Sequence, residues 1–74
     1  MLYKAMDIQT IKKKKRHGDV GMASRLSPAS TVHIFKILAS GKMPTRGKGL
    51  VGIKVLSRII AERERLEKEV REDV

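Results

Sequence analysis

The chain contains no cysteine, and its only aromatic residues are one tyrosine and one phenylalanine. Without cysteine it can form neither a disulfide framework nor a thiolate metal site, so apolar packing must stabilise the fold. The shortage of aromatic residues argues against recognition of single-stranded nucleic acid by base stacking. The sequence has no run of 18 apolar residues and no signal-peptide pattern, so we expect neither a membrane-spanning segment nor a signal peptide. These absences favour a cytoplasmic domain.

Residue sets that catalyse reactions or bind metals are also missing. The sequence has no Ser/His/acid or Cys/His set, and His17 and His33, its only histidines, have no neighbours at metal-ligand spacing. A chain of 74 residues forms one domain with a small core and leaves little room for a pocket. We therefore expect no enzymatic activity, no metal, no cofactor and no small-molecule substrate.

Positive charge is abundant and unevenly distributed. Through Arg58 the chain has 13 basic and 2 acidic residues, a net charge of +11, whereas from Ile59 onward it has 4 basic and 6 acidic residues, a net charge of −2. A body of this sign suits a polyanion, and nucleic acid is the first candidate. An anionic membrane surface or an acidic protein would be attracted by the same field, so charge alone does not choose the partner.

A first helix is predicted over residues 7–17, after an N-terminal arm over residues 1–6. Asp7 can cap its N-terminus, and Gly18 can supply the left-handed residue that ends it. The expected inward positions are Ile8, Ile11 and the stem of Lys15. The outer face carries a run of lysine and arginine, which is either a solvated face or a set of phosphate contacts.

A second helix is predicted over residues 19–26 and a third over residues 30–40. Asp19 can cap the second helix at its positive end, and Ser27-Pro28 stops it. The second helix is expected to carry three apolar side chains inward: Met22, Ala23 and Leu26. Two short helices with a tight turn, and a small alanine where they would cross, resemble a helix-turn-helix unit.

Two registers are open for the third helix, depending on the length of the turn. The usual motif spacing gives a poor set of inward residues: Pro28, His33 and Lys36. One extra residue in the turn gives a good set: Ala29, Ile34 and Ile37, with Leu38 beside them. The second register is favoured because it keeps proline in the turn and makes Ser30 the N-cap of the helix.

The favoured register also decides which residues of the third helix point outward. These are Ser30, Thr31, Val32, Phe35 and Lys36. Phe35 is the only phenylalanine, and the favoured interpretation is that it is buried in the core, which would require the third helix to be rotated from this register. Contact with thymine methyl groups in a major groove is the alternative. Deep burial of Phe35 would show that the register is wrong.

A basic loop over residues 41–49 leads to a long helix over residues 50–72. The loop has three glycines and three cations but lacks the GxxxxGK[ST] spacing of a nucleotide-binding loop, so it is interpreted as a linker with backbone-contacting cations. The long helix has a broad apolar stripe: Leu50, Ile53, Val55, Leu56, Ile59 and Ile60. Beyond Ala61 the helix either projects into solvent or pairs with a second copy through Ile59, Leu66 and Val70.

Together these features resemble the lambda-repressor-like helix-turn-helix DNA-binding proteins, of Cro and repressor type, found in phages and mobile elements. The resemblance covers residues 8–65. It is carried by His17-Gly18-Asp19, by Ala23 and Leu26, by Ser30-Thr31, and by the segment ILASGK that closes the third helix. It implies an all-α fold, a compact bundle of four helices with a central helix-turn-helix and a long C-terminal helix.

The resemblance further implies sequence-specific binding of double-stranded DNA in transcriptional control, with helix 30–40 in the major groove. The base contacts would be Thr31, Val32, Phe35 and Lys36. The phosphate contacts would be Lys12, Lys13, Arg16, His17, Ser30, Lys42, Arg46 and Lys48. A homodimer through the C-terminal helix would read two half-sites, and the protein would be associated with the nucleoid.

Two other functions are compatible with the sequence, because fold does not fix function. The first is a phage-type interaction module, an inhibitor or adaptor whose basic face docks on an acidic host protein. The second is non-specific binding of nucleic acid, including RNA. Selection of bound duplexes would separate these classes, because only the DNA regulator should enrich one motif.

Overall fold

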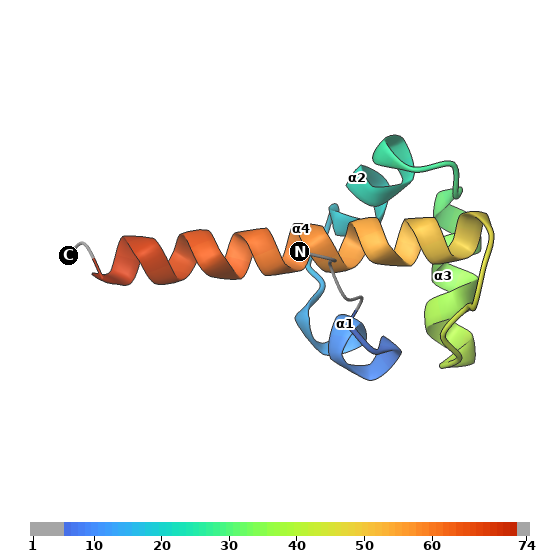
Figure 1. Cartoon of the computed structure of the whole chain (residues 1–74), viewed down its shortest axis with the longest axis horizontal. Coiled ribbons are helices and arrows are strands. Elements are labelled where there is room, and N and C mark those ends of the chain that lie inside the picture. Colours follow the sequence, from blue (N-terminus) through green and yellow to red (C-terminus); the bar gives the residue numbers. More distant parts are fainter. Residues whose placement is uncertain (1–5, 73–74) are drawn as a thin grey trace.

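A computed structural model describes residues 6–72, and within that range it contains four helices and no strand. The helices are α1 (Ile8–Lys14), α2 (Asp19–Leu26), α3 (Thr31–Ser40) and α4 (Lys48–Glu72). Figure 1 shows that α1, α2 and α3 surround the first half of α4, whereas the last turns of α4 extend beyond them. The expected all-α bundle of four helices with a long C-terminal helix is confirmed. Residues 1–5 of the predicted arm lie outside the described residues.

The boundary between α1 and α2 differs from the prediction. Asp7 caps α1 as expected, because its carboxylate accepts a hydrogen bond of 2.7 Å from the Thr10 N–H, which lowers the pKa of Asp7. However, α1 ends at Lys14 and not at residue 17. Gly18, with φ 91°, precedes α2 as its N-cap, and Asp19 is the first residue of that helix. The predictions that Gly18 ends the first helix and that Asp19 caps the second are therefore wrong.

The ends of α3 follow local sequence signals. Ser30 is the N-cap, and its hydroxyl accepts a hydrogen bond of 3.1 Å from the His33 N–H. Gly41 ends the helix in the left-handed conformation, with φ 73°, which a residue with a Cβ adopts only at a cost. The basic loop that follows is shorter than predicted, because α4 begins at Lys48 and not at Leu50.

The core confirms the register with the longer turn. Ala29, Ile34 and Leu38 are buried, and Ile37 is partly buried against them. Phe35 is 52% exposed, so its favoured interpretation as a core residue is wrong and α3 is not rotated. The remaining core residues come from the other three helices: Ile8, Ile11, Val20, Ala23, Ile53, Leu56 and Ile60.

The rotation of α2 contradicts another expectation. Met22 is 47% exposed and Leu26 is 65% exposed, although both were predicted to face inward. Ala23 is buried as predicted, but the second inward apolar residue of the helix is Val20, one turn away, which was not predicted. Met22 and Leu26 share an adjacent face of α2, because residues four apart lie above each other on a helix.

Two buried glycines let the first turns of α4 approach α3 and the turn before it. A Cβ at Gly52 would lie 2.8 Å from the Ala29 Cβ, and a Cβ at Gly49 would lie 2.7 Å from the Ile37 Cδ1. Both separations are shorter than a normal carbon–carbon contact. The absence of a side chain at these positions therefore fixes how closely α4 packs against α3 and the turn between α2 and α3.

Candidate nucleic-acid interface

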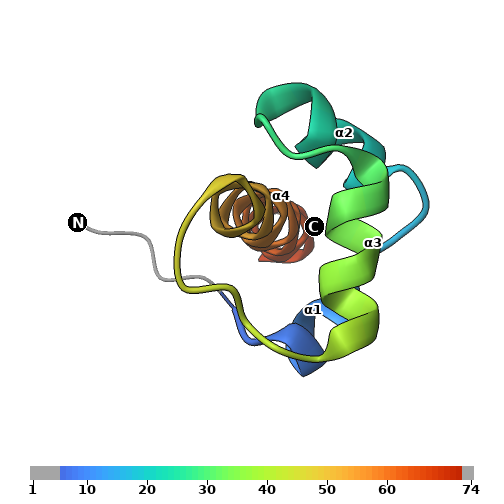
Figure 2. The same cartoon turned by 90° about the vertical axis from the view of Figure 1, so that its right-hand side faces the viewer.

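The candidate recognition helix lies at the end of the molecule opposite the free end of α4 (Figure 1). Figure 2 shows α4 on one side of α3, so that the other side of α3 is left uncovered apart from the α1–α2 connection passing beside it. All four predicted base-contacting side chains are exposed: Thr31, Val32, Phe35 and Lys36. The structure therefore brings these residues together on one outward surface, which we call the α3 face.

Lys15 borders the α3 face, which the sequence did not indicate. Its Nζ lies 5.9 Å from the centre of the Phe35 ring, within the range of a cation–π contact. Lys15 is partly buried, as its predicted inward stem suggested, but the ammonium group reaches the ring and adds positive charge beside it. The two residues are far apart in the chain, so no local pattern connects them.

Most of the predicted phosphate-contacting residues are exposed. Lys12, Lys13, His17, Ser30, Lys42, Arg46 and Lys48 are all exposed. No ion pair joins the cations of this group to another residue of the described range 6–72. Arg16 differs, because its guanidinium lies 3.0 Å from a carboxylate oxygen of Glu67 on α4. Of the predicted cations, Arg16 is thus directed toward the C-terminal helix.

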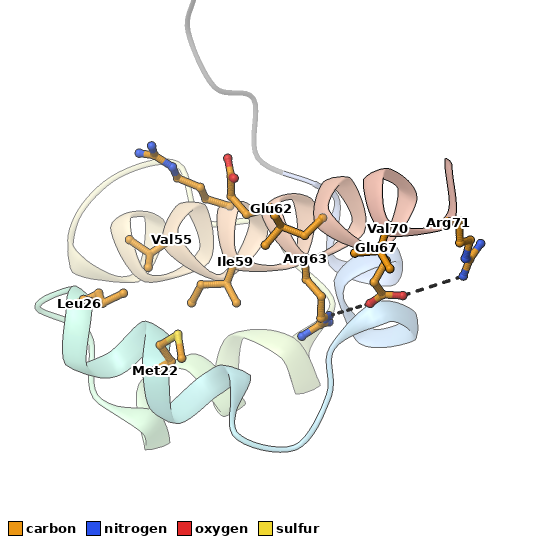
Figure 3. Close-up of a pocket in the computed structure, with 11 residues that line it drawn as sticks. Met22, Leu26, Val55, Ile59, Glu62, Arg63, Glu67, Val70 and Arg71 are labelled. Carbon is orange, nitrogen blue, oxygen red and sulfur yellow. Dashed lines mark ion pairs between the residues drawn. The ribbon is translucent and has the colours of Figure 1, made fainter. Parts of the chain in front are cut away.

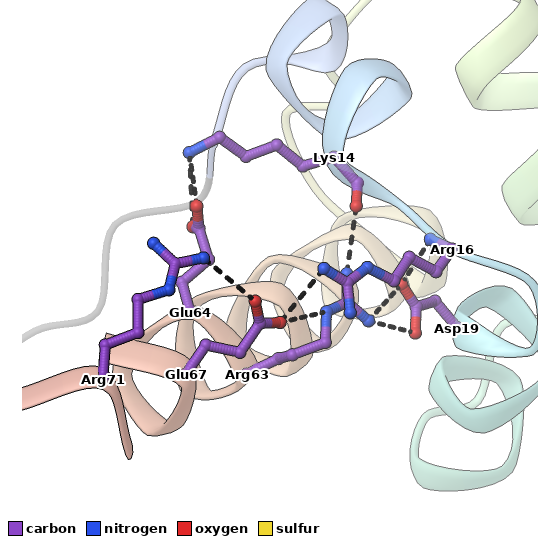
Figure 4. Close-up of polar contacts among 7 residues, drawn as sticks. All are labelled: Lys14, Arg16, Asp19, Arg63, Glu64, Glu67 and Arg71. Carbon is purple, nitrogen blue, oxygen red and sulfur yellow. Dashed lines mark hydrogen bonds and ion pairs between the residues drawn. The ribbon is translucent and has the colours of Figure 1, made fainter. Parts of the chain in front are cut away.

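An ion-pair network holds the α1–α2 connection against α4 (Figure 4). Arg63 donates to both carboxylate oxygens of Asp19 at 2.8 Å and to the backbone oxygen of Lys14 at 3.0 Å. Asp19 also accepts a hydrogen bond of 2.7 Å from the Arg16 N–H. This network positions the segment that carries Lys15 and His17 beside α3.

The state of the Asp19 carboxyl follows from these contacts. Burial alone would raise its pKa, but the hydrogen bond from the Arg16 N–H and the Arg63 guanidinium together lower it below the ordinary value of 3.8. The carboxylate is therefore charged at neutral pH and Arg63 is balanced. Sequence reasoning missed this pair, because the only signal was that Asp19 is one of two acidic residues in the basic body.

Two other features are absent from the part of the chain that the structure describes. Residues 6–72 contain no group of three or more His, Cys, Asp or Glu side chains that could hold a metal ion. No helix in this range is long and apolar enough to cross a membrane. Comparisons of the chain with models of protein families, with curated proteins and with solved structures give no match.

Proposed function

We propose that the chain binds double-stranded DNA in a sequence-specific manner, as a regulator of transcription of the lambda-repressor-like type. The observation that carries the proposal is the α3 face. Val32 and Phe35 are 62% and 52% exposed on a helix whose inward positions already fill the core. Because the fold does not use these two apolar side chains, they are free to contact thymine methyl groups in a major groove.

The polar residues of α3 support the same role. Thr31 and Lys36 lie on the exposed face beside the apolar pair and can hydrogen-bond to base edges. The first turn of α3 has no acidic residue, so the positive end of the helix dipole is not neutralised by a side chain. A helix that enters the groove by its N-terminal end would place these groups against the bases and phosphates.

The surrounding cations would supply affinity that does not depend on sequence. Lysines and arginines from α1 and from the loop after α3 are exposed, and the body through Arg58 has a net charge of +11. Phosphate contacts by such residues fix the position of a protein on a duplex but carry no sequence information. The α3 face is therefore assigned to specificity and these cations to general affinity.

Selection of bound duplexes from a random pool at near-physiological salt tests the proposal. The expected result is enrichment of one motif. Thr31→Ala and Lys36→Ala should each lose preference for that motif by more than they lose affinity for unrelated duplexes. Lys68→Ala removes an exposed cation from the far end of α4 and is the matched control, which should leave the preference unchanged.

The opposite result is equally clear. Weak and equal binding to every duplex, with the three variants indistinguishable, would contradict sequence-specific recognition. If such a protein captured an acidic protein tightly, the basic surface would be a protein-docking surface instead. Equal, salt-sensitive binding to all nucleic acids, without a protein partner, would indicate a non-specific nucleic-acid-binding protein.

A further inference from the structure

An apolar groove of about 930 Å³ runs between α2 and residues 55–71 of α4 (Figure 3). Six apolar side chains line it: Met22, Leu26, Val55, Ile59, Leu66 and Val70. Leu66 and Val70 are 53% and 63% exposed, and Met22 and Leu26 are also exposed. The expectation that so small a chain leaves little room for a pocket is therefore wrong. The groove is separate from the α3 face.

On the α4 side of the groove, the spacing of the apolar residues is the same from either end of the helix. The apolar residues are Val55, Ile59, Leu66 and Val70, and they are symmetric about the point between Glu62 and Arg63. In an antiparallel pair of α4 helices centred there, Val55 lies level with the partner's Val70. In the same pair, Ile59 lies level with the partner's Leu66. Each apolar residue of one helix thus meets an apolar residue of the other.

We propose that this groove binds a second copy of the chain, with the two α4 helices antiparallel and the two-fold axis passing between Glu62 and Arg63. The two walls of the groove fit this arrangement. Figure 3 shows Leu26 beneath Val55 and Met22 beneath Ile59. In this arrangement, the C-terminal end of the second copy's α4 lies level with Val55 and Ile59 of the first copy. There it contacts both α2 and α4 of the first copy.

The charges along the solvent side of α4 are also self-complementary. In the antiparallel register, Arg58 lies near the level of the partner's Glu69, and Glu62 lies near the level of the partner's Arg65. Glu62 and Glu69 both pair with Arg65 of their own helix, on the exposed surface. Such exposed pairs contribute little energy, so exchanging them for pairs between copies costs little. Opposite charges therefore face each other along this edge.

The charge distribution favours a second copy over an acidic or a basic partner. The body through Arg58 has a net charge of +11, so two bodies repel each other, whereas the segment from Ile59 onward has a net charge of −2. The groove spans both parts, and in the antiparallel pair the segment from Ile59 onward of each copy lies along the body of the other, so that parts of opposite net charge approach each other. Its charged residues are of both signs, and a partner of one sign would meet repulsion from some of them: Arg58, Arg63 and Arg71 with Glu62 and Glu67.

Sedimentation equilibrium of the full chain without DNA tests self-association independently of the proposed function. The expected result is a concentration-dependent dimer. Leu66→Gln should weaken the dimer about tenfold or more, because both copies lose a central apolar contact. Lys68→Gln changes an exposed residue two positions away and should leave the dimer unchanged. Both variants alter exposed residues, so circular dichroism should show an unchanged fold.

Disulfide cross-linking tests the register, because the chain has no cysteine of its own. Ile59→Cys and Leu66→Cys are prepared as separate variants, then mixed and oxidised. The antiparallel register predicts an efficient disulfide between the two variants in the mixture and little cross-linking of either variant alone. Residues that are level in the pair bring their Cα atoms to within disulfide range, whereas a 59–59 pair is about 10 Å out of register along the helix.

Three results would overturn the proposal. A monomer at all protein concentrations would exclude the dimer. Equal dimerisation of Leu66→Gln and the unmodified chain would place the interface elsewhere. Cross-linking of each cysteine variant with itself, but not with the other, would show a parallel pair. Because DNA is absent throughout, none of these results depends on whether the chain binds a duplex.

Discussion

Replacement of Gly52 by alanine tests how closely α4 approaches the turn between α2 and α3. A Cβ at this position would lie 2.8 Å from the Ala29 Cβ and 3.2 Å from the Ile34 Cγ1. Both neighbours are buried, and the Ala29 Cβ is bonded directly to the backbone of the turn. The turn cannot relieve the contact by rotating a side chain, so either the turn or α4 must move.

Two effects of opposite sign decide the outcome of Gly52→Ala. Alanine is favoured over glycine inside a helix by about 1 kcal/mol. Overpacking a filled core costs about 1–3 kcal/mol, and a rigid neighbour places this contact toward the upper end. We therefore expect a net loss of about 1–2 kcal/mol in the free energy of unfolding, with a fall in Tm of roughly 4–8 °C for each kcal/mol.

Gly21→Ala is the matched control, because Gly21 also lies inside a helix but has no atom within 4 Å of an added Cβ. This variant should gain up to about 1 kcal/mol. Urea denaturation followed by circular dichroism measures both changes, and equal slopes would show that the unfolded state is unaffected. If both variants were stabilised by the same amount, α4 would not lie against Ala29 as described.

Three further predictions follow from the charged residues. Asp19→Asn removes the nearer counter-charge of the partly buried Arg63 and leaves it only the Glu67 carboxylate at 4.0 Å, so the change should cost about 2–3 kcal/mol in urea denaturation, below the full value for a completely buried pair; an unchanged midpoint would contradict the role of the Asp19–Arg63 pair. Because the pKa of Asp19 is lowered from 3.8, its stabilisation is present above that value and is lost as the pH falls through the lower, folded-state pKa, so the acid loss of stability should be smaller in Asp19→Asn. If the chain contacts six to ten phosphates, duplex affinity measured by fluorescence anisotropy should fall about 10³–10⁵-fold between 50 and 200 mM salt, and a flat response would exclude such contacts.

The parts of the fold that could be predicted depend on short-range signals. Asp7, Ser30 and Gly41 act on backbone groups three or four residues away, so their roles follow from the local sequence. The register of α3 was also accessible, because only one register placed Ile34 and Leu38 inward. These signals gave the helices that form the candidate interface and the outward position of its residues.

The parts that could not be predicted depend on contacts between distant segments. The rotation of α2 depends on how Val20 and Ala23 pack in the core. The sequence of α2 alone is nearly as compatible with burial of Met22 and Leu26. Asp19 satisfies the sequence rules for a helix cap, yet its carboxylate accepts a hydrogen bond from Arg63, which is 44 residues away in the chain. The interpretation of Phe35 as a core residue failed because a general preference of aromatic residues for burial outweighed the register argument.

The Asp19–Arg63 contact connects the two proposed binding surfaces. Arg63 lines the apolar groove, and its guanidinium fixes the first residue of α2, which forms the other wall of that groove. The same guanidinium binds the backbone oxygen of Lys14, directly before the residue whose ammonium group lies over Phe35. Loss of the contact should therefore displace both surfaces, even though neither includes Asp19. Weakened duplex binding by Asp19→Asn would therefore not by itself show that Asp19 contacts DNA. If the same variant also loses self-association in the absence of DNA, the residue acts on both surfaces through the position of α2.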